Sequence, residues 1–178
     1  MLMFLRGARP PSLPAPLPLW PSYRQVRRFC RGVVRAAGAE PPLEVEALCT
    51  AVGRLRGRPI EVRYRALPPG MFGFSFAYDK QTRDYVVVAA NTTRMHQEHI
   101  VLHELGHILA GHIDGEATTA GDHTGDHDAA REREWTAESI AVVLAERALL
   151  HTRRFGERPA DPGSRALDDA LRGGGAWI

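Results

Sequence analysis

The stretch HIVLHELGHILAGHI at residues 99–113 decides how the rest of the chain is interpreted, because it carries the pattern His-Glu-x-x-His inside an apolar helical run. Residues four apart on an α-helix point within about 40° of each other, so His103 and His107 can present both imidazoles to one metal ion. Glu104 is the next residue around the helix, where its carboxylate can take a proton from water at the metal and pass it to a leaving amine. The motif predicts a zinc site with Glu104 as the general base. A helix that carries coincidental surface histidines is the plainer alternative.

A second segment, EWTAESIA at residues 134–141, offers the third ligand that a catalytic zinc site usually needs beside an open position. On a helix, its two glutamates share one side with two alanines, and small residues there would allow close packing against the first helix, where Gly106 also permits close approach. Glu134 is the predicted third ligand. Glu138, one turn later, is placed to accept a hydrogen bond from a ligand histidine. Both glutamates could instead be ordinary solvated charges in a run of alternating arginine and glutamate.

The other histidines fit the site less well. His99 lies on nearly the same helical face as His103 and could replace a ligand, whereas His112 points nearly opposite and is expected at the surface or facing a loop. His123 and His127 stand among aspartates and could bind a second metal ion. An exposed, flexible acidic loop is the simpler interpretation of that segment, because no fixed ligand spacing is met.

Apolar periodicity places these motifs in an α+β fold. Four segments show the 3.6-residue period of a helix, and three show the alternation of a half-buried strand, the last two joined by a polar turn that predicts a hairpin. We expect a zincin-like domain with two N-terminal helices, a small, mainly antiparallel sheet of about three strands, and two helices that carry the metal site. The predicted elements are helices over 23–37 and 42–55, strands over 60–65, 72–78 and 85–90, and helices over 94–113 and 129–152, with Thr92 or Thr93 as the cap before the third helix.

Composition indicates one globular domain without a membrane segment. The chain has 178 residues, of which 44% are hydrophobic and 25% charged, and its two cysteines are too few for a disulfide framework. Residues 1–22 are interrupted by prolines that exclude a helical signal peptide, so a disordered arm and a cytoplasmic protein are expected. The predicted organisation is this arm, a metallopeptidase-like domain over 23–152, and a C-terminal tail over 153–178.

Charge is distributed unevenly, and this bears on possible partners. Residues 1–65 hold 12 arginines against 4 glutamates, a net charge of +8, so that the remainder of this +2 chain carries −6. Several of the arginines form a stripe on the helix over 23–37, and such a stripe can contact phosphate. No helix-turn-helix, zinc-finger or aromatic stacking pattern accompanies it, so a nucleic-acid partner is not favoured.

The run HIVLHELGH at 99–107 together with Glu134-x-x-Ala137-Glu138-x-x-Ala141 resembles the ImmA/IrrE metallopeptidase-like domain. That family pairs an AHExxH-type helix with a downstream ExxA[ND]xFA-type helix, and the resemblance covers roughly residues 23–152. The chain departs from the family pattern at Leu102, which replaces a small residue, and at Glu138 and Ile140, which replace Asn or Asp and Phe.

The resemblance implies that His103, His107 and Glu134 bind one zinc ion per chain and that Glu104 is the general base. It also implies a protein substrate, in particular a transcriptional regulator with a helix-turn-helix domain. The sequence therefore predicts a zinc-dependent metalloendopeptidase. The alternative is a non-catalytic, zinc-containing regulatory module that docks a partner protein.

Overall fold

The computed structural model describes residues 12–39, 43–79, 82–113 and 127–155. These residues form four helices and three strands, in the order that the apolar periodicity predicts. The helices are α1 (Tyr23–Ala36), α2 (Val45–Arg56), α3 (Arg94–Ala110) and α4 (His127–Phe155), and the strands are β1 (Ile60–Arg65), β2 (Gly73–Asp79) and β3 (Arg83–Ala89). Among the described helices, none combines the length and the apolar character needed to cross a membrane.

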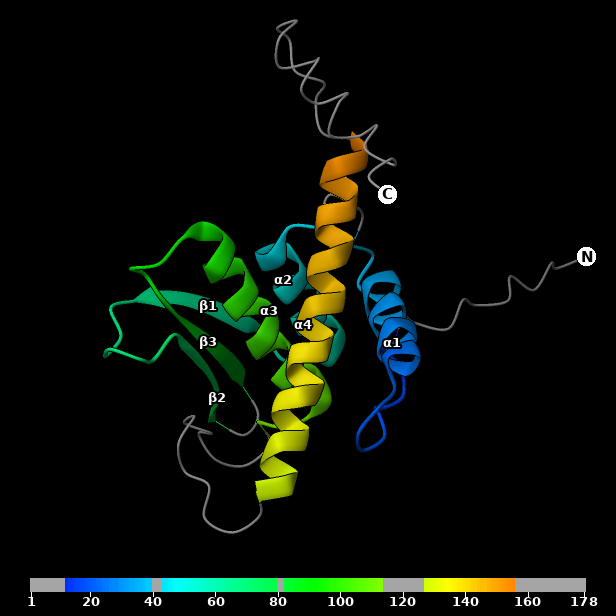
Figure 1. Cartoon of the computed structure of the whole chain (residues 1–178), viewed down its shortest axis with the longest axis horizontal. Coiled ribbons are helices and arrows are strands. Elements are labelled where there is room, and N and C mark those ends of the chain that lie inside the picture. Colours follow the sequence, from blue (N-terminus) through cyan, green and yellow to red (C-terminus); the bar gives the residue numbers. More distant parts are fainter. Residues whose placement is uncertain (1–11, 40–42, 80–81, 114–126, 156–178) are drawn as a thin grey trace, which may run out of the picture.

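Helix α3 is the central element of the fold. Figure 1 shows the sheet on one side of α3, α4 crossing its other side, and α1 beyond α4. Buried side chains fill the space between these layers. The largest come from every helix and from the middle strand, and include Val26 and Val33 of α1, Leu48 of α2, Val86 and Val88 of β3, Leu105 and Ile108 of α3, and Ile140 and Leu144 of α4.

The sheet is mixed, which corrects the expectation of a mainly antiparallel one. Its strand order is β1-β3-β2, with the predicted hairpin of β2 and β3 antiparallel and β1 parallel to β3. Strand β3 is the central strand and buries Val86 and Val88, whereas β1 and β2 each leave one edge unpaired among the described strands. The link with Pro68 and Pro69 carries the chain to the far side of β3, so β2 enters next to α3.

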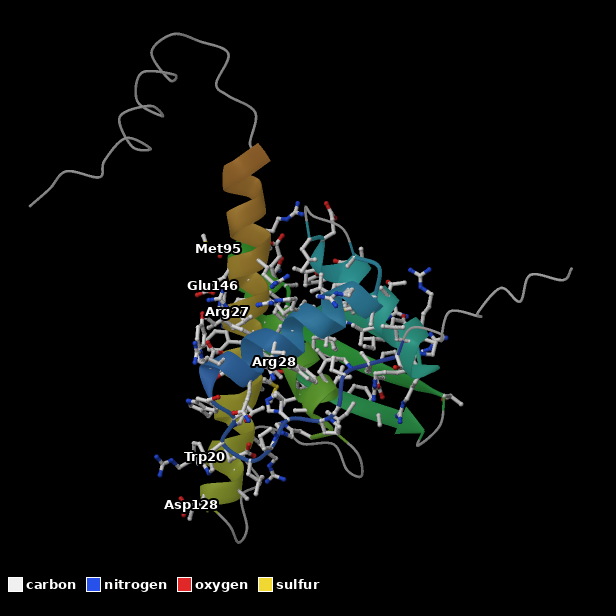
Figure 2. All side chains as sticks on the ribbon, turned by 90° about the vertical axis from the view of Figure 1, so that its right-hand side faces the viewer. Trp20, Arg27, Arg28, Met95, Asp128 and Glu146 are labelled. Atoms are coloured by element: carbon white, nitrogen blue, oxygen red, sulfur yellow. The ribbon has the colours of Figure 1, made fainter. Side chains whose placement is uncertain are left out.

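The described part of the N-terminal segment lies against the helices, which differs from the free arm expected over 1–22. Leu13 and Leu17 pack on the hydrophobic core, where they remove apolar surface from water. Trp20 lies near the start of α4 (Figure 2). Its ring contacts that of Trp135, with the two centroids 5.9 Å apart. Residues 1–11 lie outside the described ranges, and so does the predicted tail after Phe155. The domain boundary at residue 23 stays a prediction.

Candidate metal site

The site begins with the close approach of α3 and α4. Gly106 of α3 faces the backbone of Ala137 of α4, and a Cβ added to the glycine would lie only 2.6 Å from the Ala137 carbonyl oxygen. Ala137 and Ala141 are fully buried, as the small-residue side of the second segment predicted. Because the two backbones come so close, Glu134, one turn before Ala137, lies opposite the histidines of α3.

Three side chains converge at this crossing. His103 Nε2 and His107 Nε2 are 3.2 Å apart, and the Glu134 carboxylate oxygens lie 3.4 Å from the first and 3.5 Å from the second. One ligand atom from each residue can be chosen so that all lie within 4.8 Å of one another. Tetrahedral zinc with bonds of 2.0–2.1 Å needs ligand atoms about 3.3 Å apart. The spacing and the donor set of two imidazoles and a carboxylate therefore fit such an ion.

Glu138 contacts the ring nitrogen of His103 that faces away from the converging group. Its Oε2 lies 3.1 Å from His103 Nδ1, so with the proton on Nδ1 the imidazole turns its Nε2 lone pair toward the other two ligand atoms. The same oxygen lies 3.3 Å from His99 Nε2. His99 thus contacts Glu138 and is not one of the three converging side chains. The structure therefore does not place His99 as a substitute metal ligand.

His112 supports the second histidine, and here the sequence-based expectation was wrong. Helix α3 ends at Ala110 and not at 113, because Gly111 has a φ of 78° and reverses the chain. The backbone N–H groups of Gly111 and His112 donate to the carbonyls of Ile108 and His107, which is a Schellman motif. This fold-back brings His112 Nδ1 to 3.1 Å from His107 Nδ1.

Glu104 lies beside the converging group and is 8% exposed. Its Oε2 accepts a 2.7 Å hydrogen bond from the Ser75 hydroxyl of β2, which is itself buried. Burial raises the pKa of Glu104, while the Ser75 hydrogen bond and the charge of His103 act in the opposite direction. Gly73 lets β2 approach: an added Cβ would meet Ile100 at 2.3 Å and come within 3.8 Å of Glu104 Oε1. Glu104 is thus a buried carboxylate that Ser75 of β2 holds in place.

Electrostatics couple the three converging groups. Burial opposes protonation of His103, but its hydrogen bonds to Glu134 and Glu138 and the charge of Glu104 outweigh burial and raise its pKa to about 9. Burial lowers the pKa of His107 to about 4. The hydrogen bond to His103 lowers the pKa of Glu134. These shifts favour a protonated His103 beside an ionised Glu134, and metal binding would require that proton to leave.

A cleft of about 480 Å³ opens onto this group. One wall is the loop from Pro68 to Phe72 with the start of β2, and the other is α3 with Glu134 of α4. Glu104, His103 and His107 are among its lining residues. The volume falls within the range of about 300–1,000 Å³ that is usual for ligand sites.

The structure brings together all five residues that the sequence singled out, whereas the roles assigned to them stay predictions. His127 lies at the exposed start of α4, outside the group, and His123 falls outside the described residues. Sequence analysis missed Ser75 and His112. For His112, the signal was the preceding glycine at the end of an apolar helix, which is typical of a Schellman turn. For Ser75, the signal was a serine between alternating phenylalanines, which places it on the opposite face of the strand.

Comparisons with known proteins agree with this geometry. The family model described as the IrrE N-terminal-like domain, a peptidase family, matches residues 58–160. The matched region contains the whole sheet, both helices of the site and every residue of the converging group. No curated protein sequence matches the chain.

Proposed function

The chain belongs to the family of the IrrE N-terminal-like domain, and from this premise we propose that it is a zinc-dependent metallopeptidase that cleaves a peptide bond in a protein substrate. Membership of the family makes this a metallopeptidase-like domain; the metal, the residue roles and the substrate are the proposal. The observation that supports it is the convergence of His103, His107 and Glu134 at a cleft whose lining also includes Glu104.

In this proposal His103, His107 and Glu134 hold the zinc ion. When bound, zinc is a Lewis acid that lowers the pKa of a water molecule and polarises a peptide carbonyl. Glu138 and His112 bind the outer nitrogens of the two imidazoles and so keep both Nε2 atoms directed inward.

Glu104 moves the proton. Ser75 orients the carboxylate through the hydrogen bond to Oε2, and in this proposal the carboxylate accepts a proton from the attacking water and returns it to the leaving amine. Burial raises the pKa of this carboxyl and thereby makes its carboxylate a stronger base than an exposed glutamate.

The test is a cleavage assay on the zinc-loaded chain with Glu104→Gln as the decisive variant. A proteome-derived peptide library, with new termini identified by mass spectrometry, reports cleavage whatever the sequence of the natural substrate. Glu104→Gln should lower the rate by roughly 10²- to 10⁴-fold and keep its zinc, while Glu146→Gln, at an exposed position of α4, should behave as wild type.

A helix-turn-helix regulator is the first protein to add to this assay, on the family resemblance alone. Cleavage that persists in Glu104→Gln, or that survives removal of zinc by a chelator, would contradict the proposed mechanism. Zinc and regulator binding without any cleavage by the wild type would favour the non-catalytic module.

A further inference from the structure

A second hollow, of about 870 Å³, lies on the other side of His99 from the metal site. In Figure 1, α3 and α4 lie closest near the metal site and diverge toward the start of α3, where α2 lies nearby. The hollow is lined by the first turns of α2 and α3, by Tyr64 of β1, and by Ala145 and Ala148 of α4. Its volume is near the upper end of the usual range for ligand sites.

The floor of this hollow is apolar. Leu43, Val101 and Leu102 are among its lining residues and are buried against the core. Met95 stands at the rim with 77% of its surface exposed. An unbranched, polarisable side chain in that position can adapt to different apolar partners, as methionines do on promiscuous binding surfaces. The floor and this rim residue together suit aliphatic side chains.

The rim is acidic. Glu44, Glu46 and Glu98 line the hollow, and Arg94 is the one arginine or lysine among the described lining residues. Arg94 pairs with Glu98 at 2.8 Å, and Glu46 accepts a 2.7 Å hydrogen bond from the Tyr64 hydroxyl. Partial burial and the hydrogen bond to Glu46 raise the pKa of Tyr64 to about 12, with the charge of Glu98 adding to the effect. Arg94 also interacts electrostatically with Glu44, so the one arginine of the described lining faces three carboxylates and the rim keeps an excess of negative charge.

We propose that this hollow, the α2–α3–α4 groove, binds a peptide segment of a partner protein that combines aliphatic side chains with lysine or arginine. Aliphatic groups would cover the floor and the cations would pair with the rim, which repels phosphate and so disfavours nucleic acid. Because His99 lines both hollows, a segment bound here can continue toward the metal site. The proposal concerns binding alone and holds whether or not the chain cuts a peptide.

The test measures binding of three fluorescein-labelled peptides to the full chain by fluorescence anisotropy. The first alternates leucine with lysine, the second leucine with glutamine, and the third leucine with glutamate. Glu104→Gln serves as the background, so that cleavage does not interfere. We expect the leucine–lysine peptide to bind best and to weaken as salt is added, since exposed charges are screened.

The decisive variant is Glu46→Gln/Glu98→Gln in the same background. Exposed charge pairs contribute little individually, so removing both carboxylates should weaken binding of the leucine–lysine peptide about three- to tenfold. The control is Glu61→Gln/Asp128→Asn, which changes the net charge equally but alters carboxylates outside the groove. It should bind this peptide as the background does.

Three results would overturn the proposal. The first is equal binding of the three peptides, or preferred binding of the leucine–glutamate peptide. The second is equal weakening by the groove variant and the control, which would show a general charge effect. The third is that no peptide binds, while the background protein self-associates in analytical ultracentrifugation and Glu46→Gln/Glu98→Gln does not. That result would make a second copy of this chain the occupant of the groove. None of these depends on zinc content or on cleavage, so this proposal can fail while the proposed function stands.

Discussion

Gly106→Ala tests whether the close approach of α3 and α4 builds the metal site. The added Cβ would lie 2.6 Å from the Ala137 carbonyl oxygen and 3.0 Å from its Cα. Both atoms belong to the α4 backbone, so no side-chain rotation can relieve the contact. Ordinary contact begins near 3.4 Å, and the two helices would therefore have to separate by up to about 0.8 Å.

Two effects set the size of the stability change. Overpacking of a core typically costs about 1–3 kcal/mol, and alanine recovers up to about 1 kcal/mol of helix propensity over glycine. The contact with backbone is severe, so we expect a net loss of about 2 kcal/mol. A shift of this size also moves Glu134 away from the histidines by more than the roughly 0.2 Å that ligand distances tolerate. Zinc affinity should fall at least about tenfold.

The assay combines urea unfolding in the presence of a chelator with a competitive zinc titration. Gly32→Ala is the matched control, because there the added Cβ meets the side-chain ring of Pro14, at 2.6 Å, and not the backbone of a metal-site helix. We expect the control to stay within about 1 kcal/mol of wild type and to bind zinc normally. A Gly106→Ala protein as stable as wild type, with unchanged zinc affinity, would refute the argument that backbone contact positions Glu134.

Three further predictions follow from single contacts. Ser75→Ala removes the hydroxyl that orients the buried carboxylate of the motif, so the cleavage rate should fall about tenfold with unchanged zinc content; equal rates would contradict that role. His112→Ala frees the outer nitrogen of His107 and should weaken zinc binding about 10- to 100-fold in a chelator competition, whereas unchanged affinity would remove His112 from the site. Burial raises the pKa values of Cys30 and Cys49 to about 12, so at pH 8 about one thiol in 10⁴ is ionised and a thiol reagent should label neither until urea unfolds the chain. Rapid labelling of the native chain would contradict their burial.

The local elements could be predicted because each follows from its own periodicity. The helix at Arg94–Ala110 and its cap Thr93, whose side chain accepts from the His96 amide, depend on neighbouring residues only. Strand pairing depends on residues that are distant in the sequence: β3 lies between β1 and β2, parallel to the first and antiparallel to the second, and this arrangement involves three segments at once. The periodicity therefore predicted the strands correctly but not their pairing.

In the candidate site, too, contacts within one helix could be predicted from the sequence, whereas some contacts between distant segments could not. Histidines four apart on one helix meet by helix geometry alone, and the alanine side of α4 pointed to the packing that brings Glu134 opposite. His112 was misplaced because its direction was extrapolated along a helix that Gly111 ends. Ser75 could not be paired with Glu104 from the sequence, since the contact depends on how β2 packs against α3.

The most direct test of the account is zinc content per chain, measured on purified wild type beside His103→Ala, Glu134→Ala and Glu61→Gln. The account predicts about one zinc ion per chain in wild type and in Glu61→Gln, and loss or strong weakening in the two variants of the converging group. A wild type that takes up no zinc after reconstitution would contradict the account. Zinc retained by Glu134→Ala but lost by His103→Ala would contradict the assignment of the third ligand.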